Sequence, residues 1–227
     1  MEEHRLIYQA RQSVYALLQR LYQDAPDTAL LEWLATERPF ADFPVMLEND
    51  TVDALQQVDT DLQTTSVETL KRDFLRLYVG PGPMRAPPWE SVYRNQEHLL
   101  FDKHTLQVRE TYARHGMEFV NKNELPEDSI AIELEFMNLL TQRLLKTIEM
   151  EDSKAEQTLL EEQQRFLRQH MLVWVPRFVD LSQKHAETVF YRALAGVLIS
   201  FLTWEKETLA LLLNRVSEIG ETCGTLV

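Results

Sequence analysis

Histidines and carboxylates are the residues with which this chain could do metal or acid–base chemistry. The chain has 36 aspartates and glutamates and 6 histidines. A di-iron site in a helical bundle needs a glutamate three residues before a histidine on each of two helices. No histidine here has that neighbour, and the His-Glu-x-x-His zinc motif and the Gly-x-Ser-x-Gly nucleophile motif are absent from the sequence. The sequence therefore predicts a protein that is not an enzyme, and it predicts no cofactor.

The stretch from Arg76 to Tyr93 has a composition that no other part of the chain shares. Two of the 6 glycines and four of the 9 prolines lie in it. A helix is expected to end at Gly80, and the prolines after it restrain the backbone to an extended form. Because each proline also removes an N–H donor, the stretch does not fit a phosphate-binding glycine loop. The residues from Ala86 to Trp89 then form a stiff apolar shelf, whose tryptophan either plugs the core or anchors a ligand.

A second group of candidates surrounds a predicted helix start. Pro126-Glu127-Asp128-Ser129 combines a proline with acidic residues that favour the positive end of a helix. Asp128 is expected to cap this helix, to form bidentate hydrogen bonds with an arginine of a partner, or to do both. At a helix N-terminus its carboxylate is expected to stay ionised well below neutral pH.

Three other polar residues on predicted helices are weaker candidates. Glu133 and Glu135 face different sides of one helix, so both cannot serve one site. His170 lies four residues before Trp174 and could present a pair of rings to a ligand. A packed histidine at a helix end is the simpler interpretation, and we expect that role.

The elements that must position these residues are all predicted to be helices. Apolar residues recur with helical spacing, and no stretch alternates like a strand. The expected helices cover residues 5–22, 28–35, 52–62, 66–79, 105–115, 130–148 and 154–173, a short segment after Pro176, and 187–216. The pattern predicts an all-α, single-domain helical bundle over residues 1–227, with a flexible tail from about residue 217.

Charge, cysteine content and the lengths of apolar runs limit the kinds of partner and the compartment that this chain can have. The formal net charge of −13 would repel a nucleic-acid backbone, whereas it attracts a basic segment. Cys223 is the only cysteine, which excludes an intramolecular disulfide and suits a reducing compartment. The longest apolar run, Ala193 to Trp204, has about 12 residues against the roughly 20 that span a bilayer. The N-terminus has no signal-peptide pattern. We therefore expect a cytoplasmic protein without stable membrane insertion.

Three strings of this sequence together resemble one known family. They are Leu77-Tyr78-Val79-Gly80-Pro81, Ala86-Pro87-Pro88-Trp89-Glu90-Ser91-Val92-Tyr93, and Pro126-Glu127-Asp128 leading into residues 133–137. They closely resemble the TorD/DmsD family of redox-enzyme maturation chaperones. The likeness to its DmsD branch continues through residues 105–109, 170–178 and 190–194.

The resemblance implies a cytoplasmic chaperone of the family's helical fold. Such a chaperone binds the twin-arginine signal peptide of a molybdenum-cofactor oxidoreductase of the dimethyl sulfoxide reductase class, and holds export until the cofactor is loaded. The partners implied are the leader peptide and the catalytic subunit, with the translocase left open. A nucleotide-binding regulator, or an adaptor for the mature enzyme or the translocase, is the alternative.

The resemblance also implies which residues bind the peptide. They are Leu77, Tyr78, Pro87, Pro88, Trp89, Ser91, Asp128 and Ser129. A histidine usually follows the aspartate in this family, whereas Ser129 stands there in this chain, so Asp128 would act alone. The sequence leaves open the client enzyme, a monomer or a domain-swapped dimer, and the binding of guanine nucleotide or molybdenum cofactor.

Overall fold

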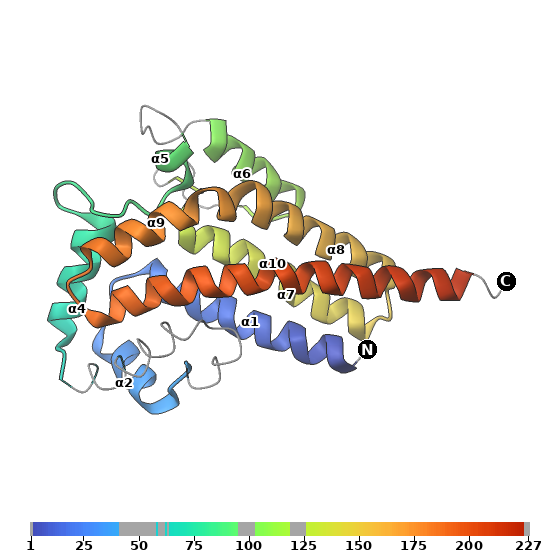
Figure 1. Ribbon diagram of the computed structural model, residues 1–227, viewed down its shortest axis with the longest axis horizontal. Helices are drawn as coiled ribbons and strands as arrows, with labels where there is room; N and C mark the ends of the chain where they lie inside the picture. The colour runs from blue at the N-terminus through green and yellow to red at the C-terminus, as the bar shows by residue number, and fades with distance from the viewer. Residues whose placement is uncertain are drawn as a thin grey trace.

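The computed structural model describes residues 2–40, 58, 62, 64–94, 103–118 and 126–224, with side chains as far as residue 218. Within these ranges the regular elements are all helical. They are α1 (Glu2–Gln23), α2 (Thr28–Glu37), α4 (Val67–Phe74), η2 (Leu75–Val79), α5 (Glu90–Arg94), α6 (Lys103–Arg114), α7 (Ile130–Glu149), α8 (Ser153–Phe166), η3 (Leu167–Met171), α9 (Leu172–His185) and α10 (Val189–Gly224). The all-α helical bundle predicted from the sequence is confirmed (Figure 1).

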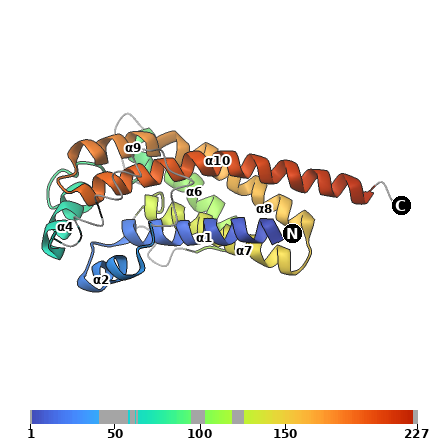
Figure 2. The ribbon, with the colours of Figure 1, turned by 60° about the horizontal axis from the view of Figure 1, so that its bottom comes forward.

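The long helices lie side by side around one apolar core. α1 packs along α7, α8 lies against α7 and α10, and α9 packs on α10. In two views α10 runs the length of the molecule, and its C-terminal end projects past the other helices (Figures 1 and 2). α4 lies at the opposite end, beside the start of α10. Among the described helices none is both long and apolar enough to cross a membrane.

A fully buried polar cluster joins α1, α8 and α10. The guanidinium of Arg11 donates to both carboxylate oxygens of Glu205, with N–O distances of 2.5 to 3.0 Å, and to Oε1 of Gln163 at 2.6 Å. The Tyr15 hydroxyl donates to Oε1 of Glu205 at 2.7 Å. The side chains of Arg11 and Glu205 are completely shielded from solvent. This cluster fixes how the three helices are set against one another.

Asp73 ties the end of α4 to the start of α10. Its Oδ2 accepts hydrogen bonds from the backbone N–H groups of Glu187 and Thr188, at 3.0 and 2.9 Å, and from the Thr188 hydroxyl at 2.8 Å. Three donors on one buried carboxylate oxygen hold α4 in place. The loop that leaves η2 therefore starts from a fixed position.

Most helices agree with the pattern in the sequence. Ser66 caps α4 by accepting from the N–H of Thr69 at 3.2 Å, and Gly116 adopts φ +63° after α6, both as expected. The predicted helix over 52–62 falls almost entirely outside the described residues. α10 continues to Gly224, and a flexible tail from about residue 217 stays a prediction.

The break predicted at Pro176 is wrong, because α9 runs through it. A proline ring clashes with the carbonyl four residues earlier, which here belongs to Leu172. Leu172 is the first residue of α9, directly after the π-helical turn η3. Because Leu172 is the first residue of α9, Pro176 costs this helix only the hydrogen bond to its first carbonyl, and the chain stays helical.

Candidate functional site

Two motifs far apart in the sequence meet as a short antiparallel pairing. Trp89 and Ser129 form a β-bridge. The N–H of Ile130 donates to the Pro88 carbonyl, and the N–H of Glu90 donates to the Asp128 carbonyl, both at 2.9 Å. The backbone on each side of Trp89 is therefore fixed against the start of α7.

The loop before this pairing is held against η2. The N–H of Gly80 donates to the Leu75 carbonyl at 2.7 Å, and Gly80 has φ +107°, a conformation that side chains other than hydrogen rarely allow. The helix thus ends at Gly80, as predicted. The chain then returns, and the N–H of fully buried Ala86 donates to the Leu77 carbonyl at 2.9 Å. These bonds place the Pro87-Pro88-Trp89 segment beside η2.

A largely apolar groove lies between the end of α1, η2, the Pro-Pro-Trp segment and the start of α7. Its volume is about 500 Å³. The described residues that line it are Tyr22, Gln23, Asp24, Ala25, Phe74, Leu75, Tyr78, Val79, Pro88, Trp89, Pro126, Ser129, Ile130, Ala131 and Ile132. Asp24 is the one charged residue among them. A mostly apolar lining with few polar groups is typical of a ligand-binding pocket.

The structure brings the residues predicted to bind peptide into one region, at different depths. Tyr78, Pro88, Trp89 and Ser129 line the groove, and Pro88, Trp89 and Ser129 are partly exposed. The other four do not line it: Pro87 is partly exposed, and the rest are buried, namely Leu77, Ser91 and Asp128. That these residues bind a peptide stays a prediction.

The contribution of α1 to the groove is the part that the sequence did not indicate. Tyr22 and Asp24 lie where α1 ends, and nothing in their local pattern distinguishes them from any other helix end. The sequence placed Phe74 and Leu75 in the helix before the loop, but it did not indicate that they line a groove. Which helix end closes a groove is decided by how the helices pack, and that information is not local.

Asp128 has a structural task that differs from the one expected. Ser129, not Asp128, caps α7, since its hydroxyl accepts from the N–H of Ile132 at 3.4 Å. The Asp128 carboxylate is fully buried, and accepts from the N–H of Ser91 at 2.7 Å and from the Thr105 hydroxyl at 3.0 Å. Burial raises the pKa of Asp128 above its ordinary value, although the hydrogen bonds from Ser91 oppose this shift. Desolvation therefore outweighs the stabilisation of the anion expected from the helix N-terminus, and ionisation of Asp128 well below neutral pH stays a prediction.

A second buried cluster includes Glu90, the residue that follows the Pro-Pro-Trp segment. Glu90 is fully buried, forms an ion pair with Arg94, and bonds Nδ1 of His170 at 2.9 Å. His170 is buried and stacks on Phe166 with ring centroids 4.8 Å apart, as expected for a packed histidine. The indole of Trp174 donates to the carboxylate of Glu133 at 3.1 Å. These contacts join α5, α7, α8, η3 and α9.

Glu133 is completely buried, whereas Glu135 is exposed, so the prediction that they face different sides of α7 is confirmed. Burial raises the pKa of Glu133 well above its ordinary value, and the negative charge of Glu90 adds to this shift. Folding therefore favours the protonated carboxyl group. Its contribution to stability is fully present below the ordinary pKa, and is lost as the pH rises through the folded-state pKa.

We expect Glu133→Gln to become more stable relative to the parent as the pH rises. The free energy of unfolding of the parent should fall from about pH 4.5 upward on account of Glu133. The amide cannot ionise, so the variant should lack that part of the slope. Urea unfolding at several pH values between 5 and 9 measures both proteins. Parallel pH profiles would mean that Glu133 is ionised in the folded protein.

Comparison with known proteins identifies the family of this chain. The family model described as nitrate reductase delta subunit matches residues 47–180. The Tat proofreading chaperone DmsD of Salmonella typhi is 31% identical over 156 residues, which cover 68% of this chain and 70% of the relative. The chaperone protein TorD of Vibrio cholerae is 28% identical over 221 residues, which cover 92% of this chain and 96% of the relative.

The fold itself recurs in a solved structure. The crystal structure of a redox enzyme maturation protein from Archaeoglobus fulgidus superposes with a TM-score of 0.50 at 19% identity. The superposition covers 83% of this chain and 93% of that one. This similarity bears on the architecture, and not on any ligand.

The relatives of this chain carry the names of chaperones rather than catalysts. The chain belongs to the nitrate reductase delta subunit family, that of the TorD and DmsD chaperones. It is a redox-enzyme maturation chaperone and not an enzyme. The described residues also contain no group of His, Cys, Asp and Glu side chains that could hold a metal ion.

Proposed function

We propose that this chaperone binds the twin-arginine leader peptide of a molybdenum-cofactor oxidoreductase in the groove beside Trp89. By holding the leader, it delays export until the cofactor has been inserted and the enzyme has folded. The observation that carries the proposal is the groove itself. It is built from the motifs that mark the family, it is lined mainly by apolar and aromatic side chains, and no described lining residue is basic.

The chemistry of such a leader matches this surface. A twin-arginine leader is basic near its N-terminal end and apolar after it. The apolar part loses contact with water when it enters the groove, at about 25 cal/mol for each Å² of apolar surface removed. The basic part is attracted by a chain whose formal net charge is −13. Holding a peptide in this way needs no covalent chemistry, which agrees with a protein that is not an enzyme.

Calorimetric titration of the protein with a synthetic leader tests the proposal. We expect saturable binding that weakens as salt rises, because the screening length falls from about 10 Å at 0.1 M to about 3 Å at 1 M. A leader whose two arginines are replaced by glutamines should bind more weakly and with less dependence on salt. If the unmodified leader does not bind, the proposed function is wrong.

A second experiment distinguishes leader binding from the function of an adaptor for the mature enzyme. The oxidoreductase is offered to the immobilised chaperone with and without its leader. The proposal requires retention of the form that carries the leader. Equal retention of the two forms would place recognition on the mature part of the client instead.

A further inference from the structure

The groove needs a carboxylate that can reach the arginines of a leader, and Asp128 is not available for that task. Its side chain is fully buried. One carboxylate oxygen accepts from the N–H of Ser91 and the other from the hydroxyl of Thr105, at 2.7 and 3.0 Å. An arginine could form a bidentate pair with this carboxylate only by displacing these hydrogen bonds and the packing that shields it from solvent.

Asp24 is placed differently. It is exposed, it lines the groove, and it lies directly after Gln23, the last residue of α1. Its carboxylate makes no hydrogen bond or ion pair with any residue that the structure describes. The neighbouring Asp27 is already engaged, because its carboxylate caps α2 by accepting from the N–H of Leu30 at 2.8 Å.

The charges around Asp24 favour a cation beside it. None of the described groove residues is a lysine, arginine or histidine. The nearest cation along α1, Arg20, lies over the ring of Trp33, with its guanidinium carbon 4.9 Å from the ring centroid. The C-terminal end of α1 adds the negative end of a helix dipole at the same place. The edge of the groove therefore has an unneutralised negative charge next to an apolar floor.

We propose that Asp24 pairs with an arginine of the leader and thereby determines which peptides enter the groove. This inference rests on the proposed function and assigns its charge recognition to Asp24 instead of Asp128. The planar guanidinium can form two parallel hydrogen bonds with one carboxylate. The apolar residues that follow the arginines then lie along Trp89 and Val79, which is exposed in the groove. The ligand class is a peptide with an arginine directly before an apolar segment.

A double-mutant cycle tests this pairing. The parent and Asp24→Asn are each titrated with the leader and with the leader whose arginines are replaced by glutamines. We expect Asp24→Asn to weaken binding of the arginine leader by roughly five- to tenfold, as for a partly exposed charged pair. The glutamine leader should bind both proteins with the same affinity. Asp24→Glu should retain most of the affinity for the arginine leader.

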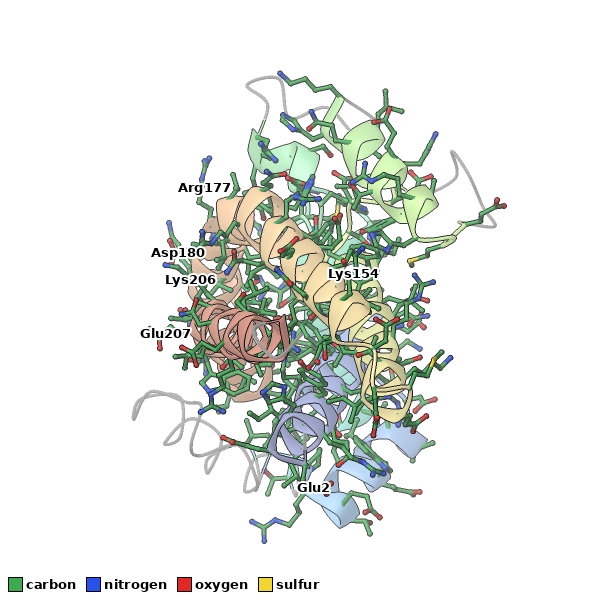
Figure 3. All side chains as sticks on the ribbon, turned by 90° about the vertical axis from the view of Figure 1, so that its right-hand side faces the viewer. Glu2, Lys154, Arg177, Asp180, Lys206 and Glu207 are labelled. Atoms are coloured by element: carbon green, nitrogen blue, oxygen red, sulfur yellow. The ribbon has the colours of Figure 1, made fainter. Side chains whose placement is uncertain are left out.

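Asp180→Asn is the matched control, since it makes the same change of charge away from the groove. Asp180 is exposed on α9, and it lies with Arg177, Lys206 and Glu207 along one side of the bundle formed by α9 and α10 (Figure 3). This variant should bind the arginine leader like the parent. Urea unfolding of both aspartate variants verifies that neither change has altered the fold.

The outcomes separate this inference from the proposed function. If the parent binds the leader but Asp24→Asn behaves like Asp180→Asn, the pairing is refuted and leader binding stands. An equal loss with both leaders would also refute it, because the effect would not pass through the arginines. Failure of the parent to bind the leader would overturn the proposed function, and the role of Asp24 with it.

Discussion

Replacing Trp89 with alanine should weaken leader binding by about 2 kcal/mol, which is roughly 30-fold in the dissociation constant. Trp89 is partly exposed in the groove, and its backbone is fixed by the hydrogen bonds between Ile130 and Pro88 and between Glu90 and Asp128. The indole is thus presented in one place, so binding a peptide costs little additional conformational entropy. Because these hydrogen bonds join backbone atoms, the alanine variant should keep the shape of the loop.

Trp204→Ala provides the matched control. Trp204 is also partly buried, stacks on Phe201 with ring centroids 6.1 Å apart, and lies outside the groove. Calorimetric titration and thermal unfolding of both variants distinguish the two roles of a tryptophan. If Trp89→Ala melts at a lower temperature but binds the leader like the parent, then Trp89 plugs the core and does not anchor the peptide.

Breaking the buried pair of Arg11 and Glu205 should have the largest effect on stability. We expect Glu205→Leu to lower the free energy of unfolding by about 3 to 5 kcal/mol. Both side chains are completely shielded from solvent, so the variant leaves the Arg11 guanidinium as an uncompensated buried charge. The Tyr15 hydroxyl also loses its acceptor. Urea unfolding at neutral pH measures the change.

The double variant Arg11→Met with Glu205→Leu tests the cause of that loss. Removing both charges should recover most of the stability, since replacing a whole buried pair by apolar residues is often close to neutral. Glu3→Gln serves as a surface comparison, because Glu3 pairs with Arg215 at 2.7 Å where both side chains are largely exposed. It should unfold at nearly the same urea concentration as the parent. A double variant as unstable as Glu205→Leu would show that the cavity and the lost hydrogen bonds, rather than the charge, are responsible.

The helices could be predicted because each one buries a stripe of apolar residues with its own regular spacing. α1 and α7 illustrate this, since their buried residues repeat every three or four positions. The same reasoning failed at Pro176, because the proline lies near the start of α9 and removes only the hydrogen bond to the first carbonyl of that helix. The spacing of apolar residues does not show that a helix continues through a proline.

Only two of the segments that form the groove could be recognised from the sequence. The Pro-Pro-Trp segment has a distinctive composition, and the start of α7 is marked by its proline and acidic residues. Asp24 and Tyr22 come from a third segment, and their place in the groove follows from the packing of α1 against α7. The burial of Asp128 was missed for a similar reason, since its partners Ser91 and Thr105 approach from other elements.

The pairing of Trp89 with Ser129 determines when, during its own synthesis, the protein can first bind a client. The two halves of the pairing are separated by about 40 residues, and a ribosome adds roughly 5–20 residues each second. For some seconds the growing chain therefore carries the Pro-Pro-Trp segment without the residues around Ser129 that pair with it. Until the start of α7 has emerged, the nascent chaperone has an unprotected apolar segment of its own and no finished groove to offer a client.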